Sequence, residues 1–210
     1  MKMKSMKIEM MNKKLAMMNK KLALTVAMLA AVLVTMLAGS SFVSAAPAAR
    51  MASSESEARG AVERAFQQLK GGDYNSLYDV LPSASQRRVT RERFVGALER
   101  TRGMYELERL EIGAVRVAGD LGMVDSVVYG RVRAPFAGEA KIVARQYLVR
   151  EGGRWRVTTG DAATIRPLLA SNPAFGRKYP FAQPRVFLKR DNRWVDVSKE
   201  LGSLRRRATR

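Results

Sequence analysis

The segment from Gly138 to Asp161 places the tightest constraint on the fold, because its residues alternate with a period of two around a glycine pair. Such alternation is typical of antiparallel strands, and Gly152-Gly153 supplies the residues that a tight turn needs. The pattern therefore predicts a hairpin with one face directed to a core. Before the turn, the two alternating sets are Ala140, Ile142, Ala144 and Leu148, and Lys141, Val143, Arg145, Tyr147 and Val149.

Three helices are predicted before the strands. Ser54 and Glu57 form a capping box that predicts a helix start at Ser54, and Gly71-Gly72 ends this helix. Asp73 is a cap for a short second helix, and Thr90 for a third over residues 91–102. Apolar residues recur at helical spacing along the first helix, at Ala58, Ala61, Val62, Ala65, Phe66 and Leu69.

From residue 107 the apolar period changes to two, which predicts strands over residues 107–117 and 121–133. The alternation slips phase near Gly113-Ala114, so we expect a bulge there. With the hairpin, this makes three helices followed by four antiparallel strands. The order predicts an α+β domain in which the helices pack on one face of a curved four-stranded sheet, a cone.

Beyond Asp161, four prolines punctuate a stretch with few regular patterns, and residues 162–210 are expected to form an extended arm. Within the arm, residues 185–197 predict a second hairpin that turns at Asp191-Asn192. An isolated hairpin is marginally stable in water, so this one should dock on the domain or on a partner. The chain ends with a basic tail that contains Arg205, Arg206 and Arg207.

Two short motifs resemble the nuclear transport factor two-like superfamily, the cystatin-like α+β cone also found in ketosteroid isomerase. Residues 72–78, GDYNSLY, are similar to the family's link between its first helices, and residues 152–157, GGRWRV, to its terminal hairpin. The resemblance covers residues 54–161. It implies a cone with a pocket between helices and sheet, and in many relatives a dimer formed through the sheet.

The N-terminal residues have the features of an export signal. Lysines precede an uncharged apolar run over residues 22–38, and Val43-Ser44-Ala45 is a small-residue cleavage pattern. We therefore expect residues 1–45 to be a signal peptide, residues 46–53 a linker and residues 54–161 the domain, in a periplasmic or secreted protein. An uncleaved membrane anchor is the alternative. A repeated heptapeptide leaves open whether translation starts at Met1, Met17 or Met18.

Composition excludes several kinds of chemistry. The chain has no Cys and no His, so Cys-His and Ser-His-Asp nucleophile systems, disulfides and ordinary zinc sites are excluded. No phosphate-binding glycine loop or metal-ligand cluster is present, and no cofactor or metal is expected. Residues 46–210 carry 31 Lys and Arg against 18 Asp and Glu, a net charge of +13. Such a domain is attracted to anionic membranes, polysaccharides or acidic proteins, whereas nucleic acid is not expected outside the cell.

The resemblance to isomerases does not extend to their catalytic residues. Their oxyanion-binding tyrosine corresponds to Ala65, and their general-base position falls in residues 83–88, which contain no carboxylate. Asp125 and Tyr129, on the second strand, are the remaining candidates for acid-base catalysis, with Asp125 as the base. The same pattern also fits an Asp paired with an arginine.

Binding residues are predicted in two groups. Aromatic and acidic side chains are candidates to line a ligand pocket: Phe66, Tyr74, Tyr78, Asp125, Tyr129, Tyr147 and Trp194. Trp194 fits either self-docking or a binding surface, whereas Trp155 fits the core. Basic residues are candidates for an anionic contact: Arg87, Arg88, Arg91, Arg93, Arg205, Arg206 and Arg207.

Together these features favour an exported, non-catalytic binding module of the cell envelope. Its partner is either a small apolar ligand in the cone pocket or an anionic envelope component, such as a protein, a membrane surface or a polysaccharide. Two alternatives stay open. One is an isomerase- or lyase-type enzyme that uses Asp125, and the other is a structural homodimer formed through the sheet.

Overall fold

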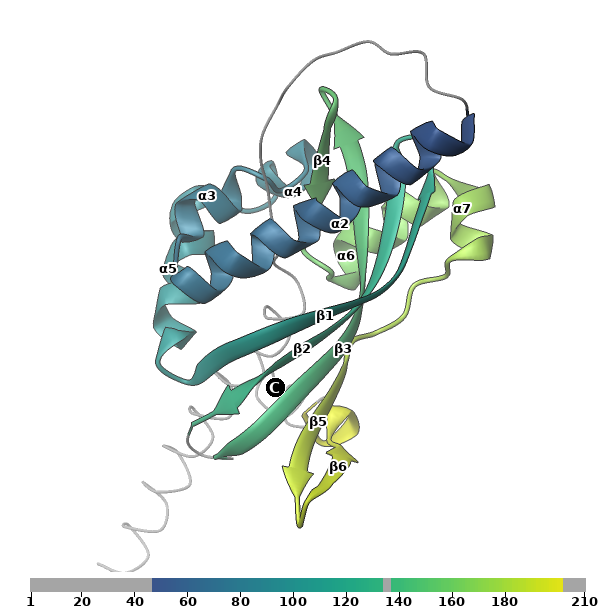
Figure 1. Cartoon of the computed structure of the whole chain (residues 1–210). Coiled ribbons are helices and arrows are strands. Elements are labelled where there is room, and N and C mark those ends of the chain that lie inside the picture. Colours follow the sequence, from purple (N-terminus) through teal and green to yellow (C-terminus); the bar gives the residue numbers. More distant parts are fainter. Residues whose placement is uncertain (1–46, 134–136, 202–210) are drawn as a thin grey trace, which may run out of the picture.

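The computed structural model describes residues 47–133 and 137–201. Four helices precede the strands in this part of the chain (Figure 1). They are α2 (Pro47–Gly71), α3 (Tyr74–Tyr78), α4 (Ser83–Gln86) and α5 (Arg91–Arg102). The prediction of three helices was therefore wrong by one, because residues 83–86 form an additional short helix.

Helix α2 begins at Pro47, before the capping box, and includes most of the residues expected to form a linker. Residues 47–53 contain several alanines, which have the highest helix propensity, and proline is well tolerated in the first helical turn. The end of the helix is as predicted. Gly72 adopts a φ of 79°, and the Asp73 N–H donates to the carbonyl of Gln68 over 2.9 Å, so these residues close the helix.

The sheet has six antiparallel strands instead of the expected four, and it does not close on itself. Its strands are β1 (Tyr105–Ala118), β2 (Leu121–Val132), β3 (Gly138–Glu151), β4 (Arg154–Val157), β5 (Arg185–Arg190) and β6 (Arg193–Asp196). The order across the sheet is β1-β2-β3-β5-β6, and β4 also pairs with β3. The fold class is thus α+β with helices before an antiparallel sheet.

The two extra strands are the C-terminal hairpin. It turns at Asp191 and Asn192, whose φ angles of 48° and 59° match the predicted tight turn. Strand β5 pairs with β3, with Ala140 opposite Leu188 and Val143 opposite Arg185. The hairpin therefore docks by extending the sheet. The predicted irregularity near Gly113 is also confirmed, because the β1–β2 register shifts between Ile112 and Val115.

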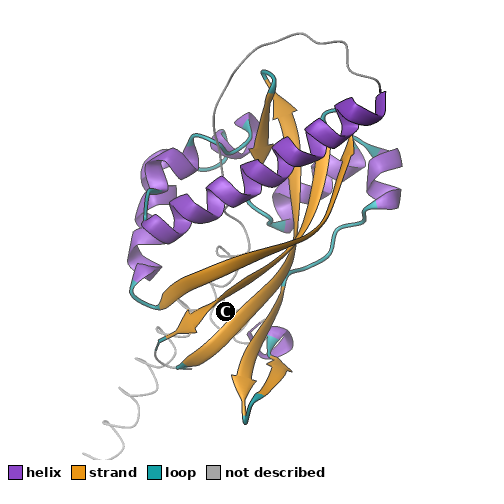
Figure 2. Ribbon diagram, in the orientation of Figure 1, coloured by secondary structure: helices purple, strands orange, loops and turns teal. Residues whose placement is uncertain are grey.

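Helices cover both faces of the sheet (Figure 2). On the first face, α2, α3 and α5 bury Leu77, Phe94 and Leu98 against Val124 and Leu148. Trp155 belongs to this core and is 5% exposed, as the sequence indicated. Removal of these apolar side chains from water is the main stabilising contribution to the fold.

On the opposite face, two helices occupy the arm that the sequence analysis expected to be extended, α6 (Ala162–Ala170) and α7 (Pro173–Lys178). Asp161 caps α6, since its carboxylate accepts from the Thr164 N–H over 2.9 Å. Ile165 and Phe175 pack with Met123 and Tyr147 of the sheet. The Tyr147 hydroxyl donates to the carbonyl of Pro180 over 2.7 Å and so fastens the following segment.

Candidate functional site

Helices α6 and α7 cover only one end of their face of the sheet, and the other end is exposed. Val143, in the middle of β3, is 38% exposed, and Trp194 of β6 is 36% exposed. The strand registers place their neighbours on the same face, because directly paired residues project to the same side. We define the open sheet face as Arg109, Glu111, Asp125, Val127, Tyr129, Lys141, Val143, Arg145, Arg185, Phe187 and Trp194.

Aromatic rings and cations stack against one another on the open sheet face. The rings of Trp194 and Tyr129 meet edge to face, with centroids 6.2 Å apart. The Lys141 ammonium lies 4.7 Å from the Trp194 ring centroid and 5.3 Å from that of Phe187. The Arg109 guanidinium lies 3.6 Å from the Tyr129 ring centroid. Cation–π attraction from Lys141 on β3 and Arg109 on β1 therefore holds these rings in place on three other strands.

Ion pairs neutralise most of the charge around this cluster. Arg145 pairs with Asp125 over 3.1 Å, and Arg109 pairs with Glu111, which also accepts from the Tyr129 hydroxyl. Three further pairs flank the cluster: Arg131 with Glu108, Arg185 with Asp196, and Lys189 with Glu139. The open sheet face is thus an apolar and aromatic surface with locally balanced charge, unlike the strongly basic chain as a whole.

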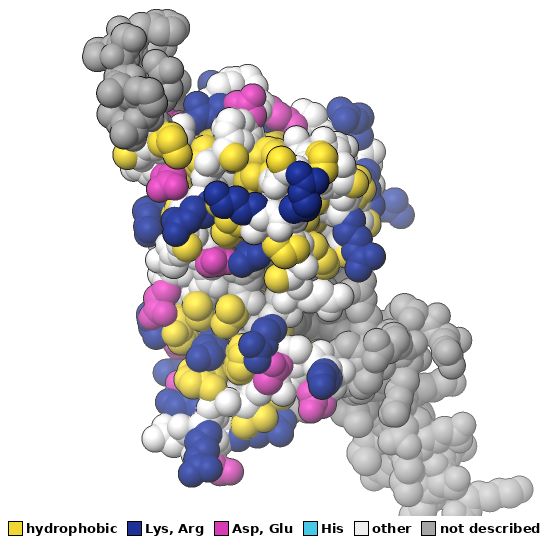
Figure 3. Space-filling model, turned by 90° about the vertical axis from the view of Figure 1, so that its right-hand side faces the viewer, with side chains coloured by type: hydrophobic (Ala, Val, Ile, Leu, Met, Phe, Trp, Pro, Cys, Tyr) yellow, Lys and Arg dark blue, Asp and Glu magenta, His cyan; other side chains and the backbone are white. Residues whose placement is uncertain are grey.

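A surface hollow of about 410 Å³ lies beside the cluster. Its walls include Val127 and Val143, the Asp125–Arg145 pair, and Gln183 from the segment that leads to β5. Figure 3 views the molecule from the side of α7 and the β5–β6 hairpin. Hydrophobic side chains in its lower half lie among basic and acidic ones. The accessible lining of the hollow is mostly apolar, and the Asp125–Arg145 pair supplies charged groups beside it, as in a protein interface with an apolar centre and a polar rim.

The structure separates the seven predicted pocket residues. Phe66, Tyr74 and Tyr78 are buried on the helix side of the sheet, and Tyr147 is buried beneath α6 and α7. Asp125, Tyr129 and Trp194 lie together on the open sheet face. The space between α2, α3, α5 and the sheet, where a cone pocket was expected, is filled by core side chains such as Leu77, Phe94 and Leu98.

Sequence reasoning missed Arg109, Lys141 and Phe187. Strand alternation places Lys141 on the same face as Tyr147, but the pairing of β3 with β5, which brings Phe187 and Trp194 beside it, is not readable from local pattern. Asp125 pairs with Arg145, the arrangement that the sequence analysis set against a role as catalytic base. Among the described residues, no group of acidic side chains is arranged to hold a metal ion.

The predicted basic cluster is only partly one surface. Arg91 is engaged, because it pairs with Asp79, donates to the carbonyl of Asn75 over 3.0 Å and stacks on Tyr78. Arg88 and Arg93 line a hollow together with Arg100, which the sequence analysis did not single out. Arg87 is exposed. Arg205, Arg206 and Arg207 lie outside the described residues.

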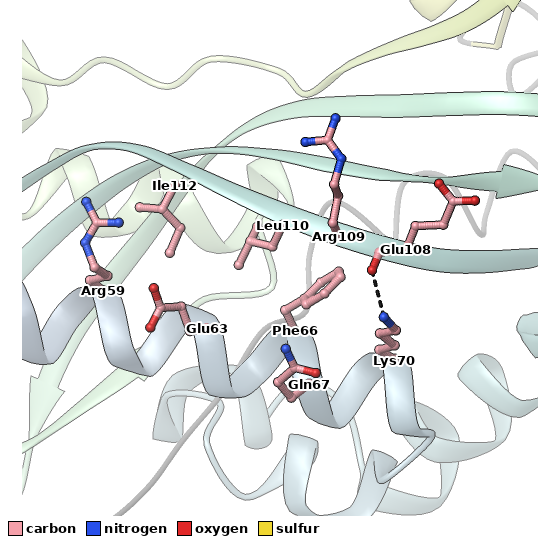
Figure 4. Close-up of a pocket in the computed structure, with 9 residues that line it drawn as sticks. All are labelled: Arg59, Glu63, Phe66, Gln67, Lys70, Glu108, Arg109, Leu110 and Ile112. Atoms are coloured by element: carbon pink, nitrogen blue, oxygen red, sulfur yellow. Dashed lines mark hydrogen bonds between the residues drawn. The ribbon is translucent and has the colours of Figure 1, made fainter.

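A third hollow, of about 380 Å³, runs between α2 and the edge of β1 (Figure 4). Phe66 points from the helix toward β1, where Leu110 and Ile112 lie. The Lys70 ammonium donates to the carbonyl of Glu108 over 2.7 Å and thereby covers an acceptor on the edge strand. Lysines and bulges at an edge strand are common protections against pairing with other chains; here Lys70 comes from α2, and β1 itself has register shifts.

Comparisons with known proteins assign no family. No protein-family model matches the chain, and no curated protein matches it. Among solved structures, a SEC-C motif-containing protein from Rhodopseudomonas palustris aligns with a TM-score of 0.38 and 11% sequence identity. The alignment covers 46% of this chain and 71% of that protein. Within the described residues, no helix is long and apolar enough to cross a membrane.

Proposed function

We propose that this protein is an exported, non-catalytic binding module that contacts an envelope protein through its open sheet face. The observation that carries the proposal is the cluster of Trp194, Tyr129 and Arg109 on the open sheet face, where Val143 is 38% exposed. The leader-like residues 1–45 motivate export. Helices that precede a curved antiparallel sheet support the proposed relation to nuclear transport factor two-like domains.

The residue types favour a protein partner. Trp, Tyr and Arg dominate the binding energy of protein interfaces. Trp and Tyr bury large areas with few degrees of freedom to lose, and Arg forms several hydrogen bonds from one planar group. Here the Tyr129 ring is held by Arg109 and Trp194, and Lys141 lies over Trp194, so the cluster is ordered before binding. A preorganised surface loses less entropy on association.

Two other predicted partners receive less support. A small apolar ligand in the cone would require the filled core between α2, α5 and the sheet to open. An anionic polymer would meet a face on which Arg109, Arg145 and Arg185 already pair with carboxylates. Charge balance of this kind is compatible with a protein surface that carries both signs.

A photocrosslinking amino acid at Val143 tests the proposal in cells of the protein's own host. The matched control is the same amino acid at Val195, which is 39% exposed against 38% for Val143 and projects to the other side of its strand. We expect a crosslinked product from position 143 and none from position 195. Trp194→Ala should abolish the product, since it removes the largest ring of the cluster.

Equal crosslinking from both positions, or a product that Trp194→Ala leaves unchanged, would contradict a specific interface on this face. The mass of the product identifies the partner. A product of twice the mass of the mature chain would mean that the partner is a second copy of this chain, the sheet-mediated homodimer of the sequence analysis.

A further inference from the structure

A second surface, distant from the open sheet face, concentrates positive charge. Arg88, Arg93 and Arg100 surround a hollow of about 550 Å³, and Val89 and Glu92 complete its lining. Arg93 and Arg100 are seven residues apart on α5, so they lie on one side of the helix about two turns apart. Arg88 comes from the segment before the helix. The hollow therefore has three guanidinium groups and one carboxylate.

Neighbouring groups position two of the arginines that line the hollow. Arg100 folds back along α5, and its Nη1 lies 3.4 Å from where a side chain on Gly96 would begin. Because Gly96 has no side chain, the Arg100 guanidinium has room beside α5 at that position. Arg88 is held from the other side, because its Nη1 donates to the carbonyl of Ala163 and to the Thr164 hydroxyl of α6.

The acidic side chain in the lining offsets only one of the three positive charges. Glu92 lies in the first turn of α5, where hydrogen bonds from its own backbone N–H and from Thr90 lower the pKa of its carboxyl. No ion pair joins Glu92 to Arg88, Arg93 or Arg100 in the part of the chain that the structure describes. This differs from the open sheet face, where arginines pair with neighbouring carboxylates.

We propose that the Arg88–Arg93–Arg100 hollow binds a phosphate group. Guanidinium groups form paired, charge-assisted hydrogen bonds with phosphate oxygens, and several of them match the multiple oxygens of one tetrahedral anion. Among the described residues the lining contains no aromatic ring, so it has no platform on which a nucleobase would stack. The ligand is therefore a compact phosphate, either a lipid headgroup or a free phosphate.

Calorimetric titration of the full chain with inorganic pyrophosphate tests the chemistry, and flotation with vesicles tests the source. The vesicles contain phosphatidylglycerol in one arm and phosphatidylcholine in the other. The test variant is Arg93→Gln/Arg100→Gln, which spares Arg88 because that residue also supports α6. The matched control, Arg190→Gln/Arg193→Gln, removes the same charge at the exposed β5–β6 turn, away from α5 in Figure 1.

We expect the test variant to weaken binding by about tenfold or more, and the control by less than about twofold, because only the first removes direct phosphate contacts. Binding to phosphatidylglycerol but not to pyrophosphate would identify a lipid headgroup, and the reverse a free phosphate. If the protein bound neither pyrophosphate nor phosphatidylglycerol vesicles, or if both variants lost binding equally, the proposal would be overturned. Neither variant changes the open sheet face, so a failure here leaves the crosslinking result intact.

Discussion

Arg88 donates a hydrogen bond to the backbone carbonyl of Ala163, the acceptor that Pro167 leaves without its usual partner. In an α-helix, the N–H of residue 167 would donate to the carbonyl of residue 163, but proline has no N–H. The Arg88 side chain therefore supplies from outside the bond that α6 cannot make internally. This contact joins the segment before α5 to the helix on the other side of the sheet.

The first prediction tests whether the Arg88 side chain replaces the backbone N–H donor that Pro167 lacks. Arg88→Ala should destabilise the protein by about 1 kcal/mol, because the carbonyl of Ala163 loses its donor. Pro167→Ala restores the internal donor, so Arg88→Ala should cost clearly less in that background. Urea denaturation of the four proteins measures the coupling. Additive effects of the two substitutions would show that Arg88 does not replace the missing N–H.

The second prediction separates the two tryptophans. Trp155 is 5% exposed in the core, so Trp155→Ala should destabilise the protein by about 3–5 kcal/mol. Trp194 is 36% exposed, and its replacement by alanine removes mainly the contacts with Tyr129 and Lys141. Trp194→Ala should therefore lower the free energy of unfolding by about 1 kcal/mol. Thermal unfolding followed by circular dichroism compares them. A large loss with Trp194→Ala would indicate a structural role in place of a binding one.

The third prediction concerns the pairing of β1 and β2. A Cβ at Gly130 would lie 2.3 Å from the backbone oxygen of Glu106, closer than two such atoms approach. Gly130→Ala should therefore push the strands apart and destabilise the protein by about 1–3 kcal/mol.

Gly71 provides the matched control, since no atom lies within 4 Å of its Cβ position and it ends helix α2. Gly71→Ala should be neutral, or stabilising by up to about 1 kcal/mol. Chemical denaturation of both variants gives the comparison. Equal stability of the two would mean that β1 and β2 adapt to the extra carbon.

The fourth prediction concerns acid. The Ser198 hydroxyl and N–H, together with Arg185, lower the pKa of Asp196 from 3.8 to about 2. A carboxyl whose pKa is lower in the folded state stabilises that state above its unfolded pKa, and the stabilisation is lost as the pH falls through the folded pKa. The β5–β6 hairpin should therefore loosen between about pH 4 and pH 2.

Amide hydrogen exchange at Val186, whose N–H donates to the Ser198 hydroxyl over 2.8 Å, reports on this loosening. Asp196→Asn should remove most of the pH dependence of the protection of this amide against exchange between about pH 4 and pH 2, because the asparagine side chain does not titrate. If the original protein and the variant show the same dependence, another group controls the hairpin.

Local chemistry predicted many elements of the fold and failed where distant residues decide. Features that depend on neighbours in sequence are all present. They are the Gly138–Asp161 hairpin, the helix end at Gly72, the caps at Asp73 and Thr90 and the turn at Asp191. Helix α6 was missed because Pro167 argues against a helix. Its stability depends on Arg88 and on burial of Ile165 against the sheet, which are tertiary contacts.

The candidate site shows the same division. Alternation along the strands determined which residues share a face: Asp125 with Tyr129, and Lys141 with Tyr147. It could not determine which end of that face α6 and α7 would cover, so Tyr147 is buried while Tyr129 is only half-buried. Only the tertiary structure decided that the arm returns to pair with β3 and brings Trp194 onto Tyr129. A period of two encodes the side of a strand, whereas the neighbours on that side depend on pairing between segments far apart in the chain.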